Sequence, residues 1–298
     1  MLSILIPTYN FNITKLVGEL HYQAMENYVD FEIIVMEDGS GYFLDENKNI
    51  SQLSNCIYIV LEKNIGRSAI RNKLADTAKY NHLLFLDCDA ALPSGFFVQK
   101  YLTFCHDECV VLGGRIYDEK NTDPQYSLIR KYGKIRERND LHNLNHRLKK
   151  PMFTTPNFLI SKPIFNKIRF DETIIGYGHE DTVFGIKLHE LNIDFIYIDN
   201  PVIHVGLDKN EDFYQKTAYA VSNLYQLYES KRFPTLQNES KLLATFIKAK
   251  KYHLTFALSL IYTLSSGFIH KQLCKSNPSL LLYDIYKLLF MCKTAHKK

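Results

Sequence analysis

The chain has 298 residues, 46% of them hydrophobic and 23% charged, so it can bury a large core and is not a disordered protein. Its net charge of +4 hides an asymmetry, because residues 231–298 carry 12 basic and two acidic side chains while the first 230 residues are net acidic. This basic excess lies in an apolar tail rather than a polar stripe, which disfavours a nucleic-acid-binding protein.

The N-terminal third alternates strand and helix signals, a pattern typical of a parallel sheet with crossover helices. Polar residues follow each predicted strand, and ligands of open α/β sheets bind outside the carboxyl ends of the strands. We therefore expect one ligand-binding edge. The predicted strands are 3–7, 32–36, 57–61 and 82–87, and the predicted helices are 12–28 and about 67–79.

Beyond residue 107 the pattern is less regular, and residues 124–150 form a basic, polar stretch of helix and loop. From about residue 238 the chain is expected to be helical. The further predicted strands are 110–117, 153–161 and 195–199, and the further predicted helices are 179–191 and 211–230.

The central chemical signal is Asp87-Cys88-Asp89, which directly follows the apolar run HLLFL. Two carboxylates at the end of a strand can share a divalent cation, and their hard oxygen atoms favour Mn²⁺ or Mg²⁺. Such a cation neutralises the charge that builds on a departing nucleotide diphosphate. Asp-x-Asp pairs are also frequent in solvated turns, but the position after five apolar residues favours the metal site.

Three further clusters follow the earlier strands: Pro7-Thr8-Tyr9-Asn10, Glu37-Asp38-Gly39-Ser40 and the segment from Asn64 to Asn72. The first offers an aromatic ring for stacking on a base, and the second offers carboxylates to a base or ribose. In the third, Arg67 and Arg71 share a helical face from which they can reach phosphate or lock the acidic cluster. Each cluster alone is explained as well by a turn or a solvated helix start, but their joint order favours a nucleotide site.

In the second half, Gly176-Tyr177-Gly178-His179-Glu180-Asp181 opens a predicted helix. The glycines allow a loop to approach a sugar, and the ring of Tyr177 offers a face to it. The positive end of the helix dipole favours ionised Glu180 and Asp181, as a general base requires. The alternative is an ordinary helix start with an acidic first turn, and both can hold because one carboxylate can cap while the other reacts.

The segments SILIPTYN, EIIVMEDGS, NIGRSAIRN and LFLDCDA, within residues 3–90, together resemble the inverting glycosyltransferases of family 2, whose fold is called GT-A. The resemblance implies that Asp87 contacts the ribose or the metal and that Asp89 holds the metal. Glu37 departs from the family pattern, which more often has Asp there. The residues implied to contact the nucleotide, usually uridine, are Thr8, Tyr9, Glu37 or Asp38, and Arg71.

Gly176–Asp181 looks like the Gly-Trp-Gly-x-Glu-Asp motif of galactosyltransferases and N-acetylgalactosaminyltransferases, with Tyr177 in place of Trp. This implies that Asp181 deprotonates the acceptor and that Glu180 positions a sugar. In the resembling enzymes a histidine at the place of His204 completes the metal coordination, although a lone histidine is more often structural. The segment 153–161 resembles the acceptor side, with Asn157 as a candidate contact, and Gly113-Gly114-Arg115 is expected to shape the sugar pocket.

We therefore predict an α/β GT-A fold with a mixed, mostly parallel sheet, comprising a catalytic domain (1–235) and a basic, amphipathic helical tail (236–298). The predicted catalytic residues are Asp181 and Glu180, and the predicted metal ligands are Asp87, Asp89 and His204. The predicted nucleotide-sugar contacts are Pro7, Thr8, Tyr9, Glu37, Asp38, Asn64, Arg67, Arg71, Asp87, Cys88, Gly114 and Tyr177.

The expected reaction moves a hexose or N-acetylhexosamine from a UDP-sugar to an acceptor hydroxyl with inversion, in surface polysaccharide or glycoconjugate assembly. A nucleotidyltransferase of sugar phosphates is the alternative, and it usually has a Gly-rich basic loop where this chain has Pro-Thr-Tyr-Asn. A non-catalytic nucleotide-sugar-binding protein is disfavoured by the intact acidic residues.

The C-terminal tail provides evidence on where in the cell the protein acts. Residues 254–269 are 16 uncharged residues, short of the roughly 20 that a spanning helix needs. Basic, aromatic-rich amphipathic helices commonly lie at an anionic membrane surface, which would suit a lipid-linked saccharide as acceptor, and the acceptor is predicted to be a glycan or a lipid-linked saccharide. Packing on the catalytic domain and homo-oligomerisation stay open as alternatives.

The first ten residues lack the features of a signal peptide, and the six cysteines form no Cys-x-x-Cys pair. Cys56 and Cys88 lie in apolar runs, so we expect buried free thiols in a reducing compartment. The predicted location is the cytoplasm, with peripheral attachment to the inner face of the cell membrane left open.

Overall fold

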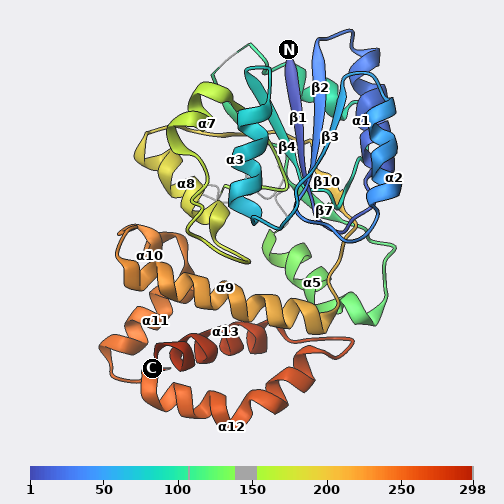
Figure 1. Ribbon diagram of the computed structural model, residues 1–298. Coiled ribbons are helices and arrows are strands. Elements are labelled where there is room, and N and C mark those ends of the chain that lie inside the picture. The colour runs from blue at the N-terminus through green and yellow to red at the C-terminus, as the bar shows by residue number, and fades with distance from the viewer. Residues whose placement is uncertain (107, 138–152, 297–298) are drawn as a thin grey trace. The chain divides into compact units, whose positions relative to one another are not determined.

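The computed structural model describes residues 1–106, 108–137 and 153–296 (Figure 1). These residues divide into two compact units. The boundary predicted at residue 235 does not coincide with this division, and as a border between functional domains it stays a prediction. The first unit comprises Met1–Asp118, 153–173 and Lys187–Gly206, and the second comprises Glu119–Glu137, Ile174–Ile186 and 207–296.

A seven-stranded sheet with strand order β3-β2-β1-β4-β8-β6-β9 forms the centre of the first unit. The strands β1 to β4 are parallel, β8 is antiparallel to both of its neighbours, and β9 is parallel to β6. The predicted mixed, mostly parallel α/β fold is therefore confirmed. The strands are β1 (Leu2–Thr8), β2 (Phe31–Glu37), β3 (Cys56–Val60), β4 (His82–Leu86), β6 (Val110–Leu112), β8 (Asn157–Ser161) and β9 (Ile196–Tyr197).

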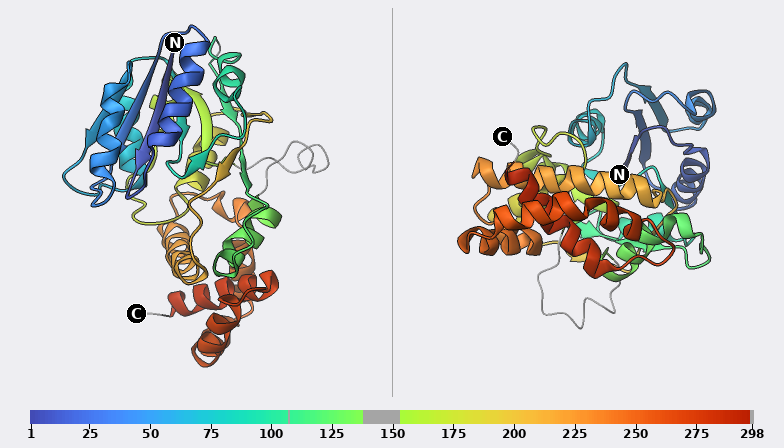
Figure 2. Two further views of the ribbon diagram at one scale, coloured as in Figure 1. Left: turned by 90° about the vertical axis from the view of Figure 1, so that its right-hand side faces the viewer. Right: turned by 90° about the horizontal axis from the view of Figure 1, so that it is seen from below.

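The central strands are buried on both faces because helices cover each side of the sheet (Figure 2). Successive side chains of a strand point to opposite faces. Ile4 and Ile6 pack in one core cluster with side chains of α1 and α4, whereas Phe85 stacks on Phe165 of α7. The helices of this unit are α1 (Thr14–Glu26), α2 (Leu44–Lys48), η1 (Asn49–Gln52), α3 (Arg67–Thr77), α4 (Phe97–Leu102) and α7 (Lys162–Ile168).

The run 110–117, predicted as one strand, forms two strands that belong to different sheets. Gly113 and Gly114 separate them. A Cβ atom at Gly113 would lie 2.3 Å from the amide nitrogen of Asn157, and Gly114 has a φ of 81°, so the chain turns out of the large sheet here. It enters a three-stranded sheet of β5 (Ala90–Ala91), β10 (Val202–His204) and β7 (Arg115–Tyr117), of which β5 and β10 were not predicted as strands.

Helices dominate the second unit, and the helical tail predicted from residue 238 is confirmed. One apolar cluster joins α9, α11 and α13 through Val221, Leu243 and Met291. The unit contains η2 (Pro124–Tyr126), α5 (Ser127–Tyr132), η3 (Gly133–Glu137), α9 (Asn210–Ser230), α10 (Leu236–Glu239), α11 (Lys241–Lys251), α12 (Thr255–Leu273) and α13 (Leu280–Ala295), and α8 (Glu180–Glu190) contributes residues to both units.

All six cysteines are free, as predicted. Cys292 is buried, whereas Cys56 and Cys88 are partly buried against the core, so the expectation of buried thiols is met only in part. Partial burial is still enough to raise the pKa of the Cys56 thiol to about 11, which keeps it protonated at neutral pH.

Candidate active site

The carboxyl ends of the parallel strands lie at one edge of the large sheet, as predicted. Thr8 at the end of β1 pairs with Glu37 at the end of β2. Leu5 pairs with Phe85 of β4, so the acidic segment 87–89 follows β4 at the same edge. The predicted nucleotide clusters and the acidic segment are therefore brought together.

Two turns at this edge are locked to each other. Asn10 has a φ of 52°, and its side-chain oxygen accepts hydrogen bonds from the N–H groups of Gly41 and Tyr42. Its own N–H donates to the hydroxyl of Ser40. Beside Asn10, Tyr9 exposes 53% of its surface, so its ring is available to stack on a base.

Asp38 fixes the loop that precedes α3. Its carboxylate accepts hydrogen bonds from the backbone N–H groups of Ile65 at 2.6 Å and Gly66 at 3.1 Å. Gly39 permits this approach, because its φ is 67° and a Cβ atom there would lie 2.4 Å from the backbone nitrogen of Asn64. Asp38 is only 5% exposed, so in this structure it positions the loop.

Glu37 is completely buried, which corrects its prediction as a nucleotide contact. Its carboxylate accepts hydrogen bonds from the hydroxyl of Ser40, the amide of Asn47 and the hydroxyl of Tyr58. Burial and the charge of Glu37 raise the pKa of Tyr58, so this hydroxyl remains a donor. The glutamate therefore joins β2 to α2 and β3.

The side chain of Thr8 is also buried. It is 1% exposed, and its hydroxyl lies 3.4 Å from the carbonyl oxygen of Ile6. The predicted contact between Thr8 and a nucleotide stays a prediction, with the backbone as the group that can make it. Among the other predicted contacts at this edge, Tyr9, Asn64 and Arg67 are exposed and Pro7 is partly exposed.

Arg71 and Asp87 form an ion pair. Arg71 is 3% exposed, its Nη2 lies 2.8 Å from Oδ1 of Asp87, and its guanidinium lies 5.5 Å from the ring centroid of Phe170. Arg71 thus locks the acidic segment, one of the two roles predicted for it. The structure shows Asp87 as an ion-pair partner, and its role as a metal ligand stays a prediction.

The side chains of Asp89 and His204 lie within hydrogen-bonding distance of each other. Ala90 of β5 pairs with His204 of β10, and this register places Oδ2 of Asp89 3.0 Å from Nε2 of His204. Burial raises the pKa of the Asp89 carboxyl, but the hydrogen bond and charge of His204 and the charges of Arg115 and Arg67 outweigh it, so the pKa lies below its usual value. Asp89 is therefore ionised at neutral pH.

The surroundings of this pair fit a divalent cation. Gly206 packs directly on Asp89, because a Cβ atom there would lie 2.6 Å from Cβ of Asp89. A carboxylate oxygen and an imidazole nitrogen are suitable ligands for Mn²⁺. Their 3.0 Å separation matches neighbouring ligands placed about 2.1 Å from an octahedral ion.

Two predicted sugar-side contacts lie inside the fold instead. Asn157 is 1% exposed, accepts a hydrogen bond from the hydroxyl of Tyr101, and donates to the carbonyl oxygens of Gly114 and Asn200. Its prediction as an acceptor contact is wrong, and the buried Gly114 serves the turn between β6 and β7.

Cys88 is partly exposed, and burial followed by the charge of Asp89 raises its pKa to about 12, so it is a neutral thiol.

In the second unit, the segment 176–181 rests on α9. A Cβ atom at Gly178 would lie 2.7 Å from Cβ of Ala220, and Gly178 has a φ of 99°. The amide of Asn223 donates to the carbonyl oxygens of Ile175 and Tyr177. The helix α9 is therefore the support of the motif.

Tyr177 contacts the same helix, since the Nζ atom of Lys216 lies 5.7 Å from its ring centroid. The sequence predicted the helix α9, but its role as the support of the 176–181 segment was not predicted. The signal available was that Lys216, Ala220 and Asn223 follow one another at helical spacing and so share one face.

Glu180 and Asp181 occupy the first turn of α8, as predicted. Glu180 is 5% exposed, whereas Asp181 is partly exposed. Oδ1 of Asp181 accepts hydrogen bonds from the N–H of Thr182 at 2.7 Å and from its hydroxyl at 3.3 Å. Both carboxylates therefore lie at the positive end of the helix dipole.

His179, which precedes them, has a φ of 74°. Burial lowers its pKa to about 4, although the charge of Glu180 and a hydrogen bond to the backbone of Ala220 act in the opposite direction. His179 is therefore neutral at pH 7.

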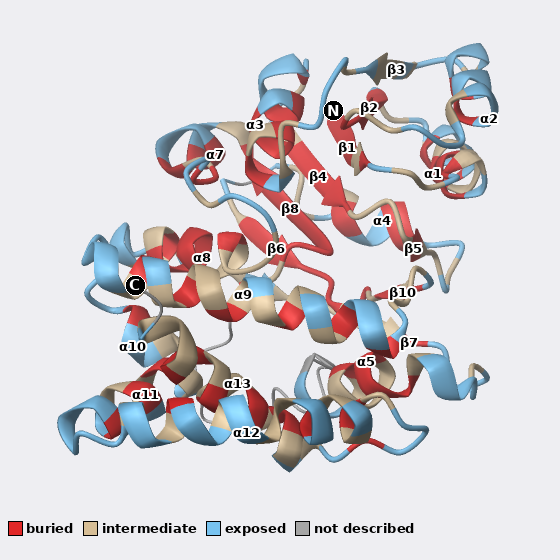
Figure 3. Ribbon diagram, turned by 60° about the horizontal axis from the view of Figure 1, so that its bottom comes forward, coloured by how far each residue is buried: buried red, intermediate tan, exposed pale blue. Residues whose placement is uncertain are grey.

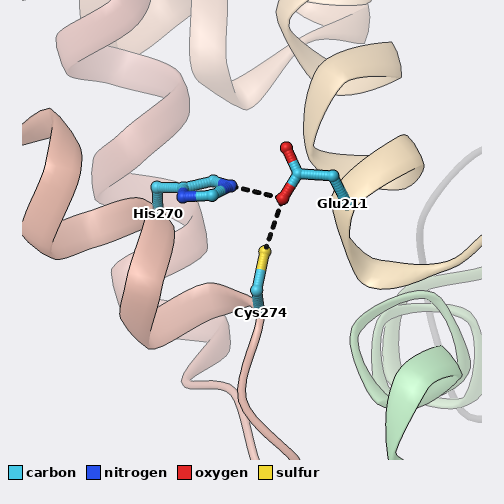
Figure 4. A group of neighbouring side chains, drawn as sticks. All are labelled: Glu211, His270 and Cys274. Carbon is cyan, nitrogen blue, oxygen red and sulfur yellow. Dashed lines mark hydrogen bonds and ion pairs between the residues drawn. The ribbon is translucent and has the colours of Figure 1, made fainter.

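A separate group of side chains in the second unit contains Glu211, His270 and Cys274, whose ligand atoms lie within 4.8 Å of one another (Figure 4). Oε2 of Glu211 is 2.5 Å from Nε2 of His270 and accepts a hydrogen bond from the thiol of Cys274. Burial and the charge of Glu211 raise the pKa of Cys274 to about 11, so it is a neutral donor here. The group ties the end of α12 to the first turn of α9.

The sequence matches the model of the family described as glycosyl transferase family 2 over residues 3–169. The chondroitin synthase of Escherichia coli is 28% identical over 221 residues, which are 63% of this chain and 32% of that protein. The chondroitin synthase of Pasteurella multocida (strain Pm70) is 30% identical over 232 residues, 66% of this chain and 24% of that protein. This chain thus spans less than a third of the length of these relatives.

Among solved structures, the mannosyltransferase PcManGT from Pyrobaculum calidifontis, in complex with GDP-Man and Mn²⁺, aligns with a TM-score of 0.59 at 13% identity. The alignment covers 100% of this chain and 87% of that one. At this identity the likeness shows a shared fold.

Proposed function

The chain belongs to glycosyl transferase family 2, and from this premise we propose that it moves a hexose or N-acetylhexosamine from a UDP-sugar to an acceptor hydroxyl with inversion. Its similarity to chondroitin and hyaluronan synthases supports a role in surface polysaccharide or glycoconjugate assembly. The observation that carries the proposal is the hydrogen bond between Asp89 and His204 in the unit where Tyr9 and Asp87 directly follow the parallel strands β1 and β4.

The donor site is assigned to the edge of the large sheet. The exposed ring of Tyr9 stacks on the uracil, and the exposed Arg67 reaches the diphosphate. Arg71 does not bind the donor directly but holds Asp87, which is 23% exposed and offers a carboxylate oxygen to the ribose.

Asp89 and His204 would hold Mn²⁺ or Mg²⁺, which would neutralise charge on the leaving nucleotide diphosphate. The ionised Asp89 supplies the negative charge for this site. Gly206 allows the carboxylate of Asp89 to keep its orientation, because the Cβ atom of any other residue at position 206 would collide with Asp89.

Asp181 is assigned as the general base. It takes the proton of the acceptor hydroxyl as that oxygen bonds to the anomeric carbon, and the electron pair of the breaking bond leaves with the diphosphate. Attack from the face opposite the leaving group inverts the anomeric configuration. The Thr182 hydrogen bond and the helix N-terminus keep Asp181 ionised, and the buried Glu180 positions a sugar.

The acceptor is proposed to be a glycan or a lipid-linked saccharide, handled in the cytoplasm at the inner face of the cell membrane. The basic, apolar tail supports this assignment, because it suits an acceptor presented at an anionic surface.

Calorimetric titration with UDP, with and without Mn²⁺, tests the cation site. We expect the wild-type protein to bind UDP about tenfold or more tightly with Mn²⁺, and Asp89→Ala and His204→Ala to lose this gain. Asp199→Ala, which removes an exposed carboxylate of the same unit, is the control and should keep it. Equal affinity of the wild-type protein with and without Mn²⁺ would refute the assignment.

A further inference from the structure

An apolar stripe runs along α12 in the second unit. Phe256, Leu260, Leu264 and Phe268 follow one another at intervals of four residues, so they form a continuous row on the helix. Their exposed fractions are 62%, 50%, 88% and 63%, and Figure 3 shows exposed segments along α12. By contrast, Ile269 is buried in the cluster that α12 shares with α13.

A contiguous row of large exposed apolar side chains marks a surface that binds another protein or a membrane. The polar groups near this row are satisfied within the helix. Thr263 donates its hydroxyl hydrogen bond to the carbonyl oxygen of Ser259, and Ser265 donates to that of Ile261. These hydroxyls therefore add little cost when the row leaves water.

The charged side chains of the segment that carries the stripe are all lysines, and Glu211 of α9 pairs with His270 near the end of α12. Residues 240–283 include six lysines and no Asp or Glu. Lys248 and Lys251 lie in the last turn of α11, just before α12, and Lys271 and Lys275 lie at the other end of α12. All four are exposed, so cations flank the stripe at both ends.

We propose that α12 lies flat on an anionic lipid surface, with the stripe at the boundary of headgroups and acyl chains and the lysines at lipid phosphates. A second copy of the chain fits less well, because parallel and antiparallel pairing of the stripes would each bring lysines against lysines. No single helix among the described residues is long and apolar enough to cross a bilayer, although α11 and α12 meet that test as a pair bent by 117°.

Flotation of the full chain with vesicles tests the proposal. We expect binding to mixed phosphatidylcholine–phosphatidylglycerol vesicles about tenfold or more tightly than to pure phosphatidylcholine, weakening as salt rises. The variant Leu264→Glu/Phe268→Glu should lose about tenfold or more of this binding. Phe96→Glu is the matched control, because Phe96 is 65% exposed in the first unit, and it should bind as the wild-type protein does.

Failure of the wild-type protein to bind mixed vesicles, or equal binding by the stripe variant, would overturn the proposal. Analytical ultracentrifugation tests the alternative occupant: a wild-type dimer that becomes a monomer in the stripe variant would assign the stripe to a second copy instead. Circular dichroism must show that the variants are folded. Nucleotide release with a water-soluble acceptor, measured on the same proteins, tests sugar transfer separately, so failure of either proposal is distinguishable from failure of the other.

Discussion

Replacing Asp181 with Asn keeps the shape of the side chain but removes the proton acceptor. We expect turnover to fall by about 10²- to 10⁴-fold while Mn²⁺-dependent UDP binding is unchanged. Steady-state release of UDP and calorimetric titration measure the two quantities. Glu190→Gln, at the exposed far end of the same helix, is the control and should leave both unchanged. Near-normal turnover of Asp181→Asn would remove this residue from the role of base.

His179 should make the folded protein sensitive to mild acid. Its folded pKa of about 4 lies below the usual 6.5, so the unfolded chain takes up a proton as pH falls through 6.5 while the folded chain does so only near 4. The free energy of unfolding should therefore drop by about 2 kcal/mol between pH 7 and pH 5 through this residue alone.

Urea unfolding of His179→Asn at both pH values checks this, because Asn tolerates a positive φ and does not titrate. The variant should lack that part of the pH dependence. His253→Asn is the control, since His253 is exposed and also has a positive φ of 59°. The same pH dependence in the wild-type protein and in His179→Asn would contradict the expectation.

At the residue scale, the sequence identified which positions lie at the sheet edge but not which way their side chains turn. Glu37 stands where expected, yet it points inward because Asn47 and Tyr58 supply hydrogen-bond donors from elsewhere in the chain. Asp87 lies at the edge as expected and pairs with the buried guanidinium of Arg71, which is one of the two roles predicted for that arginine. The inward orientation of Glu37 depends on tertiary neighbours that no local sequence pattern reports.

At the scale of elements, the addition of a single Cβ atom is expected to disrupt the contact between the 176–181 segment and α9. Gly178→Ala would place a Cβ atom 2.7 Å from Ala220 in a backbone conformation that alanine rarely adopts. We expect a loss of about 1–3 kcal/mol in the free energy of unfolding, with reduced UDP release.

Adding Ala220→Gly should restore part of this stability, because it relieves the collision but not the backbone strain. Gly18→Ala is the control: Gly18 lies in α1 with no atom within 4 Å of an added Cβ, so this variant should be at least as stable as the wild-type protein. A Gly178→Ala protein of normal stability and activity would show that the segment does not depend on α9.

The four parallel strands were predicted to within one residue at each end, because each contains a continuous apolar run. The run 110–117 was misjudged for a physical reason. Its two apolar ends are joined by Gly113-Gly114-Arg115, and the Gly113 position has no space for a side chain beside Asn157, so the chain leaves the sheet there. The strand β10, with three residues, is too short to produce a periodic signal.

At the scale of the whole molecule, the predicted catalytic groups are divided between the two units. Asp89 and His204 belong to the first, and Asp181 belongs to the second. The charge asymmetry suggested a boundary at 235, but the segments 119–137 and 174–186 group with the C-terminal helices through contacts such as that of Asn210 with the N–H of Leu128. Long-range contacts of this kind were not predictable from composition.

The most direct test of sugar transfer is to identify the phosphate-containing product. The full chain is incubated with Mn²⁺, an acceptor oligosaccharide and, in turn, UDP-hexoses and UDP-N-acetylhexosamines, and the products are separated and followed by nuclear magnetic resonance. We expect UDP to appear in step with a new glycosidic bond of inverted configuration for one of these donors. Pyrophosphate in place of UDP, or donor binding with no product from any of them, would contradict the assignment.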